Sequence, residues 1–489
     1  MEHFPILTKD FYLASSPILI LCVSSMVTML LAVSKKTCTQ RIFMVQTAGF
    51  VLALLSCLYT SATNSYLGGA FLAEEVSRFA QVLILGLSLL LTLFFRENYL
   101  KEQYFRGEIS ALFQLSTLGM LVMTSSVDLI TVFVGLELSS IGIYTLVGYI
   151  NPSRSSQEGA IKYFVLGSLA TAFFLLGLSF LYISSGSLNL AEITNHLSHT
   201  NDLWLKIGGV FTLFGFAFKL ALMPFHMWAP DAYEAAPTGL TAFMAVGVKV
   251  MILSVVLRFT RGVDIFFDEW MLCFLIFAAL SMIGGNILAL VQTSLKRMLA
   301  YSSIAHSGYM AIALCAMDKH SDLPYQAILF YLVGYSLTSL VAFGTLMWLE
   351  SQETENIQLN DLNGLVKKHP WAAVAIGISM FSFAGMPPTV GFFGKFFIFN
   401  SALHFDLYPL AIIGVVGSLI SLFYYLRVIV FMFMKEQPKN QDSLFHAKPS
   451  KIYMVILSTG CAAILLLGTV LPQKALDLIR PVATYLLRT

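Results

Sequence analysis

Residues 218–231 read FKLALMPFHMWAPD, and residues 383–395 read FAGMPPTVGFFGK. Each stretch interrupts a long apolar run with prolines and carries a lysine beside the interruption. Proline lacks a backbone donor and clashes with the preceding turn, so each helix is expected to break and leave free carbonyls. At membrane depth, such backbone is tolerated only inside protein or beside a water-filled cavity. The two stretches therefore predict a pair of broken membrane helices, a pattern typical of inverted-repeat transporters.

Composition sets the class of the protein. The chain has 489 residues, of which 57% are hydrophobic and 11% charged, with a mean hydropathy of +0.78. Soluble domains carry about 25% charged residues, so this composition indicates a polytopic membrane protein. Six cysteines are scattered singly without a CxxC spacing, which argues against an iron–sulfur or zinc site in this chain. The apolar run from Phe11 to Val33 is long enough to span, so we expect a retained first helix and no signal peptide.

Apolar runs of spanning length predict an all-α fold of about fourteen transmembrane helices. The expected spans are 11–33, 41–62, 78–95, 109–126, 128–150, 159–184, 203–223, 239–260, 271–292, 297–317, 325–349, 371–402, 407–434 and 451–471. The residues from 226 to 234 are expected to form a polar turn.

Spacing between corresponding residues indicates an internal duplication. From Lys219 to Lys395, and from Glu137 to His306, the separation is roughly 170 residues. Five helices per repeat is an odd number, so the second copy is expected to be inverted. The predicted domains are helices 1–3 (1–108), a first five-helix repeat (109–260), a second, inverted repeat (261–434) and a last helix (435–489).

Loop lysines and arginines predict the orientation. One side is rich in them and is expected to be cytoplasmic, which places both termini outside. The richer set is Lys35, Lys36, Arg41, Arg96, Lys101, Arg106, Arg154, Lys296, Arg297, Lys367, Lys368, Lys435, Lys439, Lys448 and Lys451. The poorer set is Lys9, Arg78, Lys206, Arg258, Arg261, Lys319, Lys474, Arg480 and Arg488.

Ionisable side chains in the middle of apolar helices are candidate functional residues, because a charge at bilayer depth is costly. Glu137 and Lys249 each lie near the centre of a predicted span, where neither interface is within reach. Desolvation disfavours the charged lysine and a nearby carboxylate favours it, so such a group can exchange protons. For Glu137, the bland alternative is an ion pair that only joins two helices.

Four further residues are predicted to handle protons. Lys219 and Lys395 lie beside the helix breaks, where freed carbonyls and water stabilise an ammonium; the alternative is that they only cap the broken ends. His306 relays protons through both ring nitrogens if it is not simply bonded to its neighbours. Lys162 lies near a helix end, where snorkelling to the interface is the alternative.

These residues resemble the antiporter-like subunits of proton-pumping NADH-quinone oxidoreductase (respiratory complex I), a family related to Mrp-type antiporter subunits. The most specific stretches are PFHMWAPDAYEAAP at 224–237, LKRMLAYSSIAHSGY at 295–309 and GMPPTVGFFGK at 385–395. Within the family the chain is most similar to the subunit N branch. It departs from the family at 237–240, where a Pro-Thr-Pro-Val-type start reads PTGL.

The resemblance implies a role for each residue. Glu137 matches a glutamate that pairs with the lysine of the seventh helix, here Lys219. Lys249 matches a relay residue, Lys395 the second half-channel, and Lys162 a lysine of the same hydrophilic axis. The implied mechanism is proton uptake from the cytoplasm, transfer along a wetted axis and release outside, coupled to quinone reduction elsewhere.

The resulting hypothesis is a proton-translocating subunit in a bacterial inner membrane. It has no cofactor or metal site of its own, and NADH, FMN, iron–sulfur clusters and quinone are expected in partner subunits. Its expected partners are neighbouring antiporter-like and small membrane subunits and the bilayer, with no nucleic acid. The alternatives are an Mrp-type cation/proton antiporter subunit and a purely structural membrane scaffold.

Overall fold

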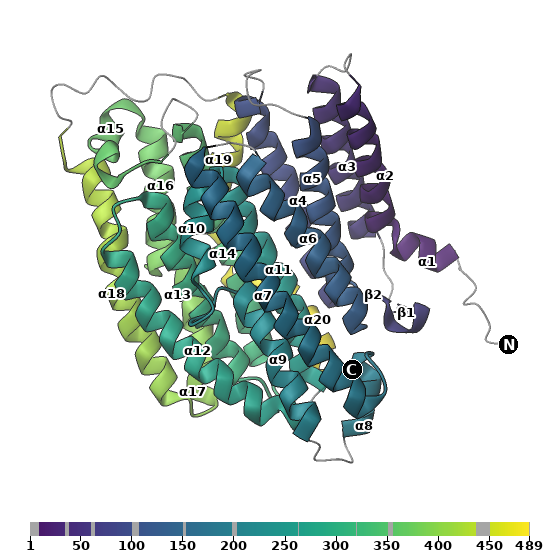
Figure 1. The fold of residues 1–489 in the computed structure, drawn as a ribbon. Coiled ribbons are helices and arrows are strands. Elements are labelled where there is room, and N and C mark those ends of the chain that lie inside the picture. Colours follow the sequence, from purple (N-terminus) through teal and green to yellow (C-terminus); the bar gives the residue numbers. More distant parts are fainter. Residues whose placement is uncertain are drawn as a thin grey trace. The chain divides into compact units, whose positions relative to one another are not determined.

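A computed structural model describes residues 9–34, 39–59, 64–99, 107–149, 153–197, 203–262, 264–318, 320–350, 356–436 and 450–488. Most of its α-helices are long, and the long ones run roughly alongside one another within each part of the chain (Figure 1). The α-helices are α1 Lys9–Ala14, α2 Ser16–Val33, α3 Thr39–Tyr59, α4 Glu75–Tyr99, α5 Gly107–Thr124, α6 Leu129–Tyr149, α7 Arg154–Ser185, α8 Leu190–Leu197, α9 Leu203–Lys219, α10 Trp228–Ala235, α11 Thr238–Gly262, α12 Asp264–Leu290, α13 Leu295–Cys315, α14 Leu323–Glu350, α15 Leu365–Lys368, α16 Pro370–Ala384, α17 Val390–His404, α18 Tyr408–Phe433, α19 Lys451–Leu467 and α20 Pro472–Arg488. Two 3-10 helices, η1 Leu67–Gly69 and η2 Leu359–Leu362, complete the helical elements.

The predicted all-α membrane fold is confirmed. Each of the fourteen expected spans contains at least one helix of the structure. Among the described residues, nine helices are long and apolar enough to cross a membrane, or up to ten if the bent pair α19 and α20 counts as one span. The short antiparallel ladder of β1 Asn64–Tyr66 and β2 Phe71–Ala73 was not expected from the sequence.

Both predicted helix breaks are present. The first apolar run ends as a helix at Lys219, and α10 begins only at Trp228. The second ends at Ala384, followed by Gly385 in the left-handed conformation (φ 78°), and α17 begins at Val390. The peptide bonds Met223–Pro224 and Pro387–Pro388 are cis.

Several shorter elements correct the expectations. The polar turn expected at 226–234 contains a helix, α10, because its alanines and its acidic first turn favour helix even between prolines. Short helices also lie between the expected spans: α8 follows the sixth span, and η2 and α15 precede the twelfth. The chain after the fourteenth span forms α20, which lies at 89° to α19; apolar residues recur on one face of α20, so it is amphipathic rather than uniformly apolar.

The chain forms two compact units. The first comprises 1–219, 247–270 and 488–489, and the second 220–246 and 271–487. In the first unit α2 packs on α3 and α5, α5 on α6, and α7 on α9 (Figure 1). In the second, α14 packs on α16, α17 and α19. The repeat boundaries at 109–260 and 261–434 stay a prediction, because compactness is a different criterion from duplication.

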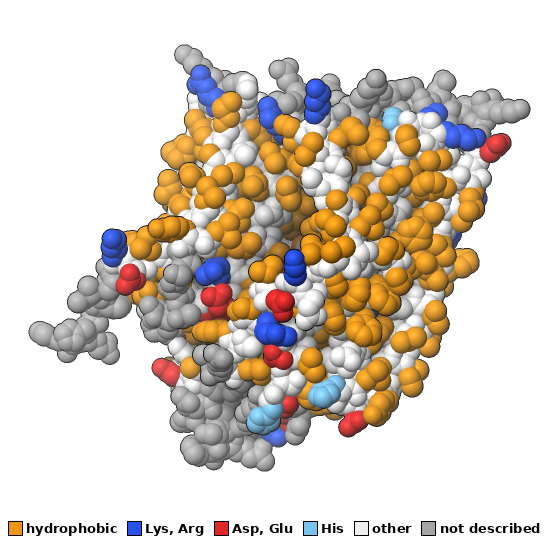
Figure 2. All heavy atoms as spheres, turned by 180° about the vertical axis from the view of Figure 1, so that it is seen from behind, with side chains coloured by type: hydrophobic (Ala, Val, Ile, Leu, Met, Phe, Trp, Pro, Cys, Tyr) orange, Lys and Arg blue, Asp and Glu red, His pale blue; other side chains and the backbone are white. Residues whose placement is uncertain are grey.

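Hydrophobic side chains cover much of the face shown in Figure 2. Large hydrophobic side chains are exposed on α2, α12 and α18, for example Leu30, Leu272 and Leu419. Soluble monomers rarely expose such extensive apolar surface, so these faces are suited to lipid or to other membrane subunits.

Candidate functional site

In the first unit, α6 carries three polar side chains on one face. Glu137, Ser140 and Tyr144 are spaced i, i+3 and i+7, which places them one above another on a helix. The helix begins at a capped end, where Asp128 Oδ2 accepts from the backbone N–H of Thr131 at 2.9 Å. This end fixes the start of the helix and therefore the direction of the polar face.

Lys219, the last residue of α9, points its ammonium toward this face. Its side chain is 4% exposed, and Nζ donates to Ser140 Oγ at 2.7 Å and to Tyr144 Oη at 2.9 Å. The same nitrogen lies 5.1 Å from the Tyr144 ring centroid and 5.7 Å from that of Tyr163. A cation at a helix C-terminus is favoured by the helix dipole, and aromatic faces add attraction. The broken end of α9 is thus a built cation site.

The expected ion pair of Glu137 with Lys219 is not formed in this structure. Glu137 is half-buried and accepts a hydrogen bond from Thr171 Oγ1 of α7 at 2.6 Å. Lys219 instead bonds Ser140, one helical turn further along the same face of α6. The two charges therefore occupy one polar face but hold separate hydroxyl partners.

Lys249 and Lys162 lie in contrasting surroundings. Lys249 is 2% exposed in the middle of α11, a helix whose apolar window is entirely buried. Lys162 of α7 is half-exposed and pairs with Glu158 at 2.7 Å, an i,i+4 ion pair on the outside of the helix. The Lys162 side chain is thus 46% exposed, as the snorkelling alternative expects.

The second unit holds a different site, centred on His306 of α13. The imidazole is 4% exposed. Its Nδ1 lies 2.5 Å from Tyr331 Oη and its Nε2 lies 3.1 Å from Tyr425 Oη. Tyr425 Oη is also hydrogen-bonded to Ser302 Oγ. A hydroxyl both donates and accepts, so each ring nitrogen has a partner with which it can exchange a proton.

Lys395 of α17 reaches back across the second helix break. Its Nζ donates to the carbonyl of Ala384, the last residue of α16, at 3.0 Å, and lies 4.8 Å from the Tyr309 ring centroid. The approach needs Gly385, because a Cβ there would lie 2.8 Å from Lys395 Cδ. The ammonium thus sits at the C-terminal, negative end of a half-helix.

A small cavity separates His306 from Lys395. It measures about 10 Å³, close to the least space that one ordered water needs. Polar groups in its lining belong to His306, Tyr331, Tyr335, Thr338, Ser382 and Lys395. Thr338 and Ser382 are already bonded to each other at 2.7 Å. A water here would have several polar partners within one small space.

Sequence reasoning missed the hydroxyl groups and two buried ion pairs. Arg258 was counted among the loop charges although it falls at the end of the expected span 239–260; it lies within α11, is 3% exposed and pairs with Glu74. Lys296, also expected in a loop, is 4% exposed and lies 3.3 Å from Glu350. The signal that was available is position: both basic residues fall within about one turn of an apolar run, where a side chain can turn inward as well as outward.

Some of the loop charges used for orientation fall outside the described residues, namely Lys35, Lys36, Lys101, Arg106, Lys319, Lys439 and Lys448. Across the part of the chain that the structure describes, no group of three or more His, Cys, Asp or Glu side chains is arranged to hold a metal ion. The polar groups that gather are instead lysines, hydroxyls and one imidazole.

Fold and site together define a class: a polytopic helical membrane protein with a buried lysine at each of two broken helices. Residues 126–421 match the family model described as NADH:quinone oxidoreductase/Mrp antiporter, TM. Because the match covers more than half of the chain, the protein belongs to this family of membrane subunits.

The chain is also similar to individual curated proteins, which indicate the branch of the family to which it is most similar. NADH-quinone oxidoreductase subunit N 1 of Herpetosiphon aurantiacus is 42% identical over 82% of this chain and 83% of its own length. NADH-quinone oxidoreductase subunit N of Rhodospirillum rubrum is 36% identical over 94% of each chain. The resemblance to the subunit N branch is therefore confirmed.

Solved structures agree. A chain of respiratory complex I from Thermus thermophilus matches with a TM-score of 0.80 and 31% identity, covering 94% of this chain and 98% of the other. A chain of the Mrp complex from Dietzia sp. matches with a TM-score of 0.84 and 21% identity, covering 97% and 98%. The second likeness concerns the fold alone.

Proposed function

We propose that the chain is a proton-translocating membrane subunit of an NADH:quinone oxidoreductase. Relatives named NADH-quinone oxidoreductase subunit N match 82% and 94% of the chain, and the chain's own residues supply groups suited to moving protons. The observation that carries the proposal is that each broken helix holds a buried ammonium among polar groups. A purely structural scaffold has no need of two costly buried cations at such breaks.

In the first unit, the proposed switch is the choice of partner for Lys219. Ser140 and Glu137 are one turn apart on α6, about 5 Å along the helix. Movement of the amine, or of α6 against α9, over that distance exchanges a hydroxyl for a carboxylate. A carboxylate stabilises the protonated ammonium more strongly than a hydroxyl does, so this exchange changes how tightly Lys219 holds its proton.

In the second unit, the proposed relay runs through the imidazole. A proton arriving on one nitrogen of His306 leaves from the other, with Tyr331 and Tyr425 as the groups that accept and donate. One water in the cavity would connect the ring to Lys395. Lys395, whose ammonium lies at the C-terminal end of α16, would then donate protons to this relay and accept protons from it.

Electron transfer belongs to other subunits in this proposal. NADH, FMN, iron–sulfur clusters and quinone are placed in partner chains, and quinone reduction there drives the switch of Lys219. The apolar faces of α2, α12 and α18 are available for neighbouring membrane subunits and lipid.

We also propose that both termini lie outside the cytoplasm. Labelling, in intact cells, of a cysteine introduced after the last residue of α20 would test this orientation for the C-terminus.

The test uses the intact complex, purified from cells and placed in vesicles. Lys219→Met and Lys249→Met are expected to abolish most proton pumping while the complex still assembles. Normal pumping in both variants would refute the proposal.

An Mrp-type cation/proton antiporter subunit is the second candidate, because a chain of the Mrp complex shares the fold. Cation/proton exchange without NADH, and co-purification without NADH-oxidising subunits, would favour that function.

A further inference from the structure

Arg258 is a buried cation that the mechanism above does not use. It lies on α11, nine residues after Lys249, and its side chain is 3% exposed. Its Nε donates to Glu74 Oε1, whose side chain is 2% exposed. A buried charge is costly unless its partners satisfy it, so the surroundings of Arg258 show what the structure must hold in place.

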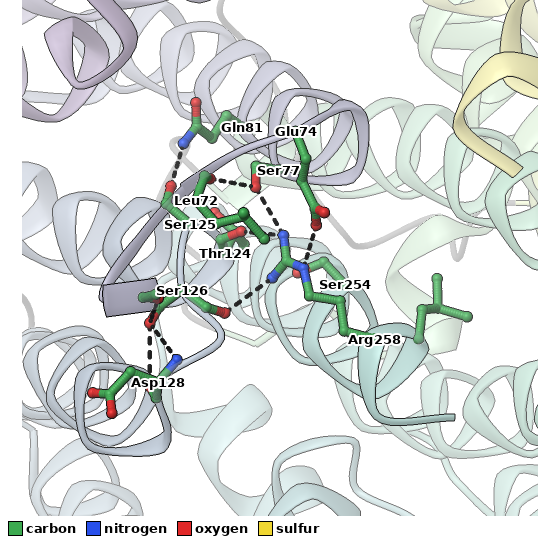
Figure 3. Close-up of polar contacts among 12 residues, drawn as sticks. Leu72, Glu74, Ser77, Gln81, Thr124, Ser125, Ser126, Asp128, Ser254 and Arg258 are labelled. Carbon is green, nitrogen blue, oxygen red and sulfur yellow. Dashed lines mark hydrogen bonds and ion pairs between the residues drawn. The ribbon is translucent and has the colours of Figure 1, made fainter. Parts of the chain in front are cut away.

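The guanidinium has four acceptors from two chain segments, residues 74–77 and residues 124–126 (Figure 3). Besides Glu74, Nη2 donates to Ser77 Oγ at 2.8 Å and to the Thr124 carbonyl at 2.6 Å, and Nη1 donates to the Ser126 carbonyl at 3.4 Å. The planar fork of arginine suits several acceptors at fixed angles, which a lysine cannot match.

The acceptors lie at the N-terminal end of α4 and the C-terminal end of α5, where the helix dipoles have opposite partial charges. Glu74 precedes α4, and its carbonyl accepts from the N–H of Arg78 at 3.0 Å, as in a capping residue. Thr124 is the last residue of α5, where carbonyls lack partners within the helix. A carboxylate is favoured at the first end and a guanidinium at the second, so Arg258 joins the two ends.

Those ends are themselves tied together. Ser77 Oγ donates to the Leu72 carbonyl at 3.0 Å, and the Leu72 N–H donates to the Ser125 carbonyl at 2.6 Å. Gln81 Nε2 donates to Ser125 Oγ at 2.6 Å (Figure 3). The Arg258 guanidinium therefore binds to the start of α4 and the end of α5, two segments that are already hydrogen-bonded to each other.

We propose that Arg258 is a positioning residue. It fixes the position of α11 along its axis and its rotation about that axis, and thereby the position of the Lys249 amine. The inference rests on the proposed function, in which Lys249 carries protons. Nine residues are about two and a half turns, so the two side chains point to opposite faces roughly 13 Å apart along the axis. Because a helix is stiff over that length, a rotation allowed at Arg258 swings Lys249 by a similar angle.

The experiment compares variants of the whole complex in vesicles. R258M leaves Glu74 alone in the interior and is expected to reduce assembly; the double variant E74Q/R258M removes both charges and is expected to restore it. R258K keeps the charge but not the fork. In the assembled R258K and E74Q/R258M complexes, the pumping rate per complex is expected to fall on the order of tenfold, because misplacement by about 1 Å slows a positioned transfer severely.

Three readouts separate positioning from plain stability. Assembly and thermal midpoint report the fold, while the pumping rate per complex and its pH profile report Lys249. The profile is expected to change shape in R258K although arginine and lysine are both cationic. Arg78→Met, which removes a nearby part-exposed arginine whose Nη1 lies 3.7 Å from Glu75 Oε1, is the matched control and should pump normally.

Wild-type pumping per complex and an unchanged pH profile in R258K and E74Q/R258M would overturn the inference. Lys249→Met in the same vesicles tells the two failures apart. If Lys249→Met is inactive while R258K is normal, only the role of Arg258 is lost. If Lys249→Met itself pumps normally, Lys249 carries no protons and the inference loses its premise; the proposed function fails only if Lys219→Met pumps normally as well.

Discussion

The two broken helices hold the same charge in different ways. Lys219 is the last residue of the first half-helix, α9, whereas Lys395 belongs to the second half-helix, α17, and reaches back to the last carbonyl of α16. In both cases the ammonium ends beside the C-terminus of the leading half-helix. The position of the charge is therefore equivalent even though the residue that supplies it is not.

The partners differ more than the positions. Lys219 bonds two side-chain hydroxyls, and a carboxylate lies one turn away on the same helix. Lys395 bonds a backbone carbonyl, and the cavity beside it is lined by an imidazole and hydroxyls, with no carboxylate in its lining. Side-chain partners can be exchanged by a small movement, while a backbone carbonyl is fixed. This difference is the basis of the proposed switch in the first unit and of the proposed relay in the second.

Removal of either lysine is the largest expected effect. Lys219→Met and Lys395→Met should each lower the pumping rate per assembled complex by at least about 100-fold, because a positioned acid–base group contributes that much. Pumping in vesicles, with assembly judged by the amount of intact complex, measures it. A variant that loses only assembly, with normal pumping by the complex that forms, would make that lysine structural and end the equivalence.

Removal of the carboxylate tests the switch. Glu137→Gln keeps the shape of the side chain but removes its charge. We expect the pumping rate to fall on the order of tenfold, while the hydrogen bonds of His306 and Lys395 in the second unit stay as they are. Thr171→Val is the matched control, because it removes only the 2.6 Å hydrogen bond to Glu137, worth about 1 kcal/mol. Equal losses in both variants would mean that the hydrogen bond, and not the charge, matters.

A smaller effect is expected at the second break. Gly385→Ala places a Cβ 2.8 Å from Lys395 Cδ and forces a left-handed φ of 78° on alanine. We expect destabilisation of about 1–3 kcal/mol, seen as a lower thermal midpoint, and a few-fold slower pumping because Lys395 is displaced. Gly86→Ala in α4, where a Cβ meets nothing within 4 Å, should be neutral or slightly stabilising. Equal midpoints in the two variants would show that the break tolerates a side chain.

The smallest effect is expected at the surface. Lys162→Met breaks a half-exposed i,i+4 pair, which is worth about 0.3–0.5 kcal/mol. Pumping should stay within about twofold of wild type. A loss as large as that of Lys219→Met would place Lys162 back on the proton path, as the family resemblance implies.

Hydropathy was sufficient for the fold because it is a local property. Each expected span contains a helix, since about twenty apolar residues have no other stable arrangement in a bilayer. The prolines at 224 and at 387–388 located the breaks for the same reason: their effect reaches only the neighbouring turn. The amphipathic α20 was missed because a helix that lies at a surface has no spanning run.

The sequence by itself determined the class of protein, the two breaks and which ionisable residues fall within apolar runs. Only the tertiary structure decided their partners. Lys219 meets Ser140 and Tyr144 at separations of 79 and 75 residues, and Arg258 meets Glu74 at 184. No local pattern specifies such contacts, because a buried charge is satisfied by whichever groups the packing of distant helices brings to it.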